Sequence, residues 1–192
     1  MLTLGGYAHK IPLETKIFHK FPWKSGLIPE KLWSIEFIDF MALFLSTFVN
    51  KIDSKGRVSV PAQFRAALTN KDFSGIVVYE SFINQCIEGC DIQRITKLSE
   101  SIDNLDPFSE ERDAFATTIL GGAMQLSIDG DGRVILPESL IEKSEISEKA
   151  LFVGKGPTFE VWNPGKFDEY LIQAKQHAKD KRNLLRLNQN KF

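Results

Sequence analysis

The chain has 192 residues, enough for one domain of ordinary size or two small ones, and 43% of them are hydrophobic, as in a globular protein. The formal net charge of −1 excludes a uniformly basic nucleic-acid coat protein, although a local basic patch would be sufficient for phosphate contacts. No run approaches the roughly 18 apolar residues of a transmembrane helix, so we expect a cytoplasmic protein without a membrane partner.

The first forty residues differ from the rest of the chain. They contain three prolines and two tryptophans and follow neither a helical nor a strand period. We therefore set residues 1–46 apart as an N-terminal extension. A functional arm is one interpretation, and a true translation start at Met41 is the other, which we favour because a regular pattern begins there.

An internal repeat organises the remainder. Asp53–Pro61 and Asp129–Pro137 lie 76 residues apart and share Asp, Gly, Arg, Val and Pro at equivalent positions. A polar–apolar alternation that is typical of a strand precedes each copy, over Phe48–Ile52 and Met124–Ile128. We interpret the repeat as a duplicated structural unit.

Each copy continues in the same expected order of a short helix, two strands and a second helix. The short helices are opened by a proline, which suits a first helical position, at Pro61–Leu68 and Pro137–Lys143. The strands are predicted over Gly75–Tyr79 and Gln85–Glu88 in the first copy, and over Ala150–Val153 and Thr158–Trp162 in the second. The second helices begin near Asp91 and at Asn163-Pro164.

One further helix is expected between the copies. Ser109 is a suitable cap for its start, and Gly121-Gly122 ends it after Leu120. The polar and acidic stretch 99–107 before it is predicted to be an exposed connector. The resulting organisation is a first repeat over 47–90, a helical connector over 91–122, a second repeat over 123–165 and a basic C-terminal helix or tail over 166–192.

The repeated Asp-x-x-Gly-Arg sequence predicts a tight turn between two strands. A turn aspartate accepts backbone N–H bonds, and glycine supplies a positive φ angle. For Asp53, Gly56, Asp129 and Gly132 we therefore favour a turn-shaping role. For the arginines we favour a mixed role, because a guanidinium group can brace the turn and still present donors outward.

Metal sites and enzymes are disfavoured. Cys86 and Cys90 have neither the usual zinc spacing nor a second ligand pair, so buried thiols are the better interpretation. The segment from Asp129 places Arg133, Val134 and Leu140 where a calcium loop needs a ligand, a glycine and a glutamate. No phosphate-binding glycine loop, nucleophile elbow or zinc-protease motif occurs. We expect no enzyme, no cofactor and no small-molecule substrate.

The repeated residues resemble a known family. Asn50–Pro61 followed by Phe64-Arg65 is similar to a first signature of the MraZ family, and Asp129–Pro137 followed by Leu151–Gly154 and Phe159–Trp162 is similar to a second. The resemblance covers about residues 41–170. Glu88-Gly89 departs from the pattern, since the second copy has Val161-Trp162 there.

The resemblance implies a fold and a function. The fold would be mainly β with short helices (α+β), a duplicated swapped-hairpin β-barrel of the AbrB type formed within one chain. The function would be that of a sequence-specific DNA-binding transcription regulator, usually a repressor, of the cell-division and cell-wall gene cluster. Such a protein would bind promoter direct repeats as a ring-like homo-oligomer and would be associated with the nucleoid.

A locally basic set around the first turn suggests where DNA would bind. Lys51, Lys55, Arg57 and Arg65 stand in sequence near only one acid, Asp53. In the second copy Arg133 lies beside Asp129 and Asp131, so we expect the first repeat to carry most of the contact. Whether Arg57 meets a base edge or a phosphate stays open.

Two alternatives stay open. Residues 166–191 carry seven Lys or Arg against three acids, and we interpret them as an amphipathic helix that packs on the barrel or on a neighbour, with a phosphate-contacting tail as the other interpretation. For the whole chain, the alternative function is a duplicated-barrel protein-interaction module that does not bind DNA. A small barrel enzyme is a more remote third candidate.

Overall fold

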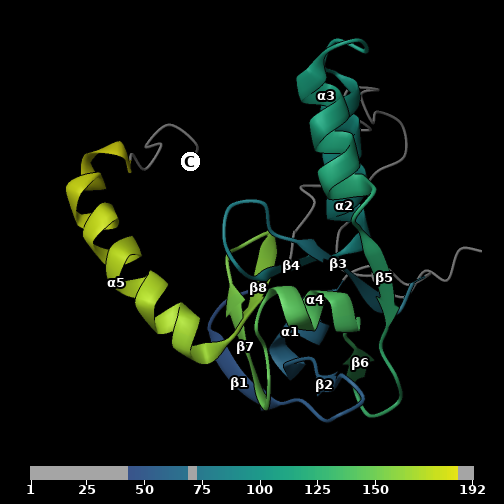
Figure 1. Cartoon of the computed structure of the whole chain (residues 1–192), viewed down its shortest axis with the longest axis vertical. Helices are drawn as coiled ribbons and strands as arrows, with labels where there is room; N and C mark the ends of the chain where they lie inside the picture. The colour runs from purple at the N-terminus through teal and green to yellow at the C-terminus, as the bar shows by residue number, and fades with distance from the viewer. Residues whose placement is uncertain (1–42, 69–72, 186–192) are drawn as a thin grey trace, which may run out of the picture. The chain divides into compact units, whose positions relative to one another are not determined.

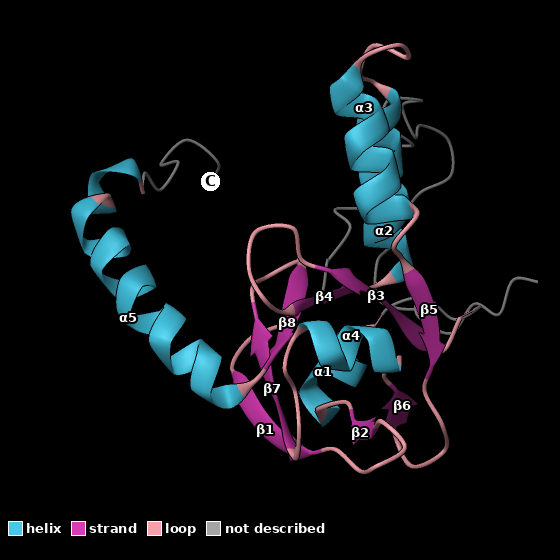
Figure 2. Ribbon diagram, viewed as in Figure 1, coloured by secondary structure: helices cyan, strands magenta, loops and turns pink. Residues whose placement is uncertain are grey.

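The computed structural model describes residues 43–68 and 73–185 (Figure 1). Nearly all of the N-terminal extension, including the expected start at Met41, lies outside the described residues. The described chain is mainly antiparallel sheet with several short helices (Figure 2), which confirms the α+β class.

Six strands form one antiparallel sheet, and two short strands form a separate ribbon. The sheet has the order β1-β7-β8-β4-β3-β5, and the ribbon pairs β2 with β6. The strand bounds are β1 Thr47–Lys51, β2 Arg57–Ser59, β3 Gly75–Glu80, β4 Ile87–Cys90, β5 Met124–Ser127, β6 Arg133–Ile135, β7 Lys149–Gly154 and β8 Thr158–Trp162. The ladder stays open between β1 and β5, so the described strands do not form one closed barrel.

The two copies exchange strands. β1 of the first copy pairs with β7 of the second, and β5 of the second pairs with β3 of the first. Backbone bonds continue both exchanges, from Ile52 N–H to the Glu148 carbonyl (3.1 Å) and from Ile128 N–H to the Ser74 carbonyl (2.9 Å). Each copy therefore satisfies its edge strand with the other copy, which leaves fewer unpaired edges than two separate units would have.

The ribbon and two helices cover one face of the sheet. Val58 and Val134 are register partners at the centre of the ribbon and are both buried. They join a core that includes Phe64 from α1 (Ala62–Ala66) and Leu140 from α4 (Glu138–Lys143). The ribbon is thus held by apolar side chains on its inner face, while the side chains on its outer face are exposed or half-exposed.

The opposite face of the sheet carries the longer helices. α2 (Ile92–Asp103) packs there through Ile95 and Ile102 against Val77 and Tyr79. α5 (Pro164–Asp180) packs on another part of this face through Phe167, whose ring contacts Trp162 at a centroid distance of 5.6 Å. The ribbon and these helices therefore occupy different faces of the sheet.

The predicted helix starts are largely confirmed. The Asp91 carboxylate accepts the Gln93 N–H at the start of α2, and the Asn163 side chain caps α5 with Pro164 at its first position. Pro61 and Pro137 are themselves the capping residues, so α1 and α4 begin one residue later than expected. The strand expected over Gln85–Glu88 lies at Ile87–Cys90 instead.

The expected exposed connector over 99–107 is wrong in its first half. α2 continues to Asp103, because Ile95 and Ile102 lie two turns apart and bury the same helix face. The next helix is confirmed: Ser109 caps α3 (Glu110–Phe115), and a π-helical turn over Ala116–Leu120 ends at Gly121. α2 and α3 together form a helical hairpin.

Candidate nucleic-acid interface

The first turn is organised by Asp53. One carboxylate oxygen accepts the backbone N–H groups of Lys55 and Arg57, both at 2.9 Å, and the other accepts Arg57 Nε at 2.6 Å. Gly56 has φ +74°, and its N–H donates to the Asp53 carbonyl at 2.9 Å. The left-handed conformation at Gly56 closes the turn and starts β2 at Arg57.

The second turn repeats this arrangement. Asp129 accepts the backbone N–H groups of Asp131 and Arg133, both at 2.9 Å, and Arg133 Nε at 3.1 Å. Gly132 has φ +78° and donates to the Asp129 carbonyl. Asp131 adds a second ion pair to Arg133. The turn-shaping geometry expected for both copies is therefore present in both.

Hydrogen bonding also explains the electrostatics of the turns. The backbone N–H of Arg57 holds the pKa of the Asp53 carboxyl below its ordinary value, and the backbone N–H of Arg133 does the same for Asp129. The pKa of Arg133 is raised, chiefly by its hydrogen bond to Asp129. Both aspartates are thus fixed as anions, and each neutralises part of its arginine's charge.

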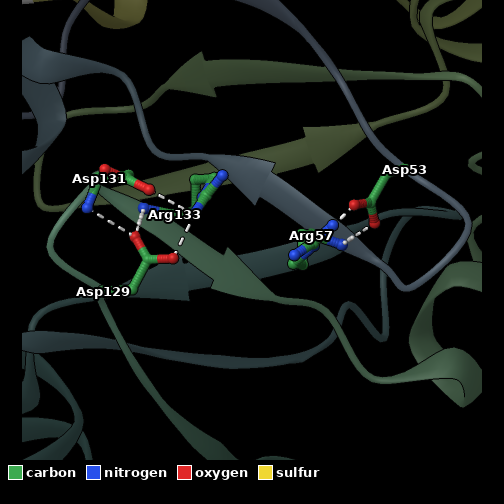
Figure 3. A network of polar contacts seen from close by, with 5 residues as sticks. All are labelled: Asp53, Arg57, Asp129, Asp131 and Arg133. Carbon is green, nitrogen blue, oxygen red and sulfur yellow. Dashed lines mark hydrogen bonds and ion pairs between the residues drawn. The ribbon is translucent and has the colours of Figure 1, made fainter.

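Both arginines lie on the outer face of the β2–β6 ribbon (Figure 3). With Val58 opposite Val134, Arg57 pairs with Ile135 and Ser59 pairs with Arg133, and these four side chains point away from the core. We call this set the ribbon face. Ser59 and Ile135 were missed by sequence reasoning, although the alternation around the two buried valines would have indicated their orientation.

The strand exchange moves Arg65 away from the expected cluster. A β-carbon on Gly132 would overlap the Arg65 guanidinium group, so Arg65 of α1 lies against the second turn and not the first. The equivalent neighbour of Gly56 is Ile141 of α4. Two bonds fasten this exchange: Val60 N–H to the Gly132 carbonyl and Leu136 N–H to the Gly56 carbonyl, each at 2.9 Å.

The expectation that the first-turn cations face only Asp53 is also wrong. Two acids of α4, Glu138 and Glu142, line a groove of about 560 Å³ together with Lys55 and Gly56. The second turn, in contrast, gains a cation from α1. The exchange between the copies therefore reduces the difference in charge between the first and second turns, which appears large when each copy is considered alone.

The remaining predicted cation, Lys51, lies at the end of β1. It is exposed and stands opposite Lys149 of β7.

Cys86 and Cys90 are both buried and free, and burial raises the pKa of both thiols, to about 12 for Cys90. Within residues 43–68 and 73–185, no group of three or more His, Cys, Asp or Glu side chains is arranged to hold a metal ion. No helix among the same residues has the length and apolar character needed to cross a bilayer.

Comparison with known proteins agrees with the motif resemblance. A family model described as "MraZ protein, putative antitoxin-like" matches residues 119–187. The protein of Rickettsia felis named transcriptional regulator MraZ is 54% identical over 146 residues, which cover 76% of this chain and 98% of the relative. The proteins of the same name from Rickettsia akari, at 53%, and Rickettsia bellii, at 54%, cover the same shares.

Proposed function

Because this chain belongs to the MraZ family, we propose that it is a transcriptional regulator that binds specific DNA sequences through its ribbon face. The relatives are named as regulators and not as enzymes. We further propose that it acts as a repressor of the cell-division and cell-wall gene cluster, in the cytoplasm at the nucleoid, and that it needs no cofactor.

The fold that we propose for this function is an AbrB-like exchange of hairpins between two repeats of one chain, with an open six-stranded sheet in place of the expected closed barrel. The reciprocal pairs β1–β7 and β3–β5 support it, as does the pairing of β2 with β6. In this fold 47–90 and 123–165 are the two repeats, and neither is expected to fold alone.

The geometry of the ribbon face is the observation that best supports the proposal of DNA binding. A two-stranded antiparallel ribbon fits the major groove of B-DNA, where arginine is the commonest specific reader of guanine. The face presents one arginine from each strand, Arg57 and Arg133, on either side of the central valine pair. Arg65, Lys55 and Lys51 surround the ribbon from α1, the first turn and β1, where they would contact phosphates.

Repetition of this face supports binding to direct repeats. In a ring-like homo-oligomer each chain would present the same ribbon in the same orientation. Several weak contacts to spaced repeats would then act together, because each binding event raises the effective concentration for the next. Double-stranded promoter DNA and other copies of the chain are thus the proposed partners.

Salt dependence of binding tests the proposal. Fluorescence anisotropy with duplex DNA from upstream of the chain's own gene, and with a scrambled duplex, would be measured at two salt concentrations. We expect preference for the native duplex and a steep loss of affinity with salt, because phosphate contacts release counterions. No preference and no salt slope would favour the alternative of a protein-interaction module.

A pair of variants locates the contact. Arg57→Ala should weaken specific binding roughly 5- to 150-fold if it reads a base, or lower the salt slope by about one if it touches a phosphate. Arg133→Ala should cost less, because Asp131 already offsets part of its charge. Lys143→Ala, which removes a half-exposed cation outside the ribbon face, is the matched control, and Lys175→Ala on the exposed part of α5 tests the C-terminal segment. A loss at Lys175 and none at Arg57 would move the contact to the C-terminal segment.

A further inference from the structure

The α2–α3 hairpin carries an apolar groove that the described chain leaves open. The groove has a volume of about 260 Å³ and is lined almost entirely by carbon side chains: Phe82, Leu98, Ile102, Leu105, Phe115 and Ile119. Phe82 and Phe115 contact each other at 6.4 Å between ring centroids, yet both remain substantially exposed. Exposed apolar surface gathered in one place marks an interaction site more often than isolated apolar residues do.

An acidic rim surrounds this groove. Residues 100–113 contain six acids and one arginine, a net charge of −5, and that arginine, Arg112, is paired with Asp103. Glu111 stands one helical turn before Phe115 and two before Ile119, so it lies on the groove side of α3. A partner for the groove should therefore be apolar at its centre and basic at its edges.

The segment 175–185, which runs from the last turns of α5 through a 3-10 turn at Arg182–Leu184, has these properties. Every side chain from Lys175 to Leu185 is exposed. The stretch carries four cations, Lys175, Lys179, Lys181 and Arg182, against one acid, for a net charge of +3. It ends in Leu184 and Leu185, which are 72% and 87% exposed. A segment of this kind gains free energy by burying its leucines and pairing its lysines.

We propose that residues 175–185, from the last turns of α5 to Leu185, dock in the α2–α3 groove of a second copy of this chain. The leucines would enter the groove, and the lysines would face the acidic rim. This inference rests on the ring-like assembly in the proposed function and assigns the surfaces that make it. The two surfaces differ, so the contact is head-to-tail and closes into a ring when the rotation between neighbours closes.

The test uses two variants of the full chain, each defective in one surface. Leu184→Ser with Leu185→Ser removes the tail contact, and Phe115→Asp blocks the groove. We expect the wild type at about 50 µM to form an assembly of several chains by light scattering coupled to gel filtration, and each variant to be monomeric. Mixing the variants should give two-chain complexes, because the intact tail of one fits the intact groove of the other and growth then stops.

Exchanging the charges of the two surfaces distinguishes a lost contact from a variant that fails to fold. Glu110→Lys with Glu111→Lys, and separately Lys179→Glu with Lys181→Glu, change only exposed residues and should each disrupt the assembly. All four substitutions together should restore it, because the complementary charges are regained. Glu148→Lys, an exposed change on another part of the surface, should leave the mass unchanged.

The outcomes separate this inference from the proposed function. A monomeric wild type, variants with wild-type mass, or a mixture that stays monomeric would each overturn the inference. DNA binding is measured separately on a duplex with a single repeat, which needs only one ribbon face. An intact salt-dependent affinity there, with the assembly unaffected by every variant, would leave the proposed DNA binding standing and this interface refuted.

Discussion

The guanidinium group of Arg65 lies over Gly132, although the two residues belong to different copies of the repeat. Gly132 adopts φ +78° and leaves no β-carbon in the space that Arg65 occupies. The contact places a cation of the first copy on the turn of the second. It links the strand exchange directly to the charge pattern of the proposed DNA-binding surface.

Alanine at either turn glycine should destabilise the fold. At Gly132 the β-carbon would be strained by the positive φ and would displace Arg65, a flexible side chain, at a cost of about 1–2 kcal/mol. At Gly56 the β-carbon would also meet the backbone carbonyl oxygen of Leu136 at 2.7 Å, so the loss should be greater. Urea unfolding at pH 7 measures both.

Gly130→Ala provides the matched control for these variants. Gly130 lies in the same turn as Gly132, but its φ is not positive, and a β-carbon there would meet nothing within 4 Å. We expect its free energy of unfolding to stay within about 0.5 kcal/mol of the wild type. Equal losses at Gly130 and Gly132 would contradict the role assigned to the left-handed position.

Asp131→Lys should strengthen DNA binding. Asp131 occupies the position that Lys55 holds in the first copy, and it forms an ion pair with Arg133. The substitution removes a repulsive anion, releases Arg133 and makes the second turn resemble the first. We expect tighter binding and a salt slope steeper by about one, measured by anisotropy. Asp168→Lys, at an exposed position of α5 outside residues 175–185, makes the same charge change elsewhere, and an equal gain there would show that only net charge matters.

The turn aspartates should make stability depend on pH in the acid range. The pKa of Asp53 and that of Asp129 are held below the ordinary 3.8 in the folded chain. Their stabilising effect is complete above about pH 4 and is lost as pH falls through the lower folded-state values. Asp53→Asn should therefore be less stable than wild type at pH 7, with the difference shrinking below pH 4. Urea unfolding across this range measures it, and a difference independent of pH would contradict the ionic role.

Lys155 should stabilise the fold by pairing with the buried carboxylate of Glu160. Glu160 is 4% exposed, accepts Lys155 Nζ at 2.6 Å and Trp162 Nε1 at 2.8 Å, and stands opposite Glu88 on β4. Burial lowers the pKa of Lys155, but the hydrogen bond and charge of Glu160 outweigh this effect and leave it raised. Lys155→Met should cost about 2 kcal/mol, less than for a fully buried pair because Lys155 is 41% exposed.

Two further variants interpret the Lys155 result. Lys143→Met breaks the Lys143–Glu80 pair, in which both side chains are about half exposed, and should cost under about 1 kcal/mol. Lys155→Met combined with Glu160→Gln should recover part of the loss, because no unpaired charge is then buried. Thermal unfolding of the three variants gives the comparison, and a double variant less stable than Lys155→Met alone would argue against the ionic explanation.

Local features of this protein were readable from the sequence. Asp53 with Gly56 and Asp129 with Gly132 define their turns through bonds that span four residues, so the residue types alone indicate the geometry. The caps at Asp91, Ser109 and Asn163 are local in the same sense. The doubled motif also indicated the family, because two copies at one spacing carry more information than either copy alone.

Only the tertiary structure decided which residues of one copy contact which residues of the other. Whether Arg65 lies on its own turn or on the other depends on β2 pairing with β6, and residues 76 apart are brought together by the buried pair of Val58 and Val134. The position of Glu88 opposite Glu160 also depends on the pairing of strands that are distant in sequence. The extension of α2 to Asp103 likewise depends on the burial of Ile102. Burial of apolar surface selects these pairings, and since it depends on the whole core at once, no short window of sequence determines it.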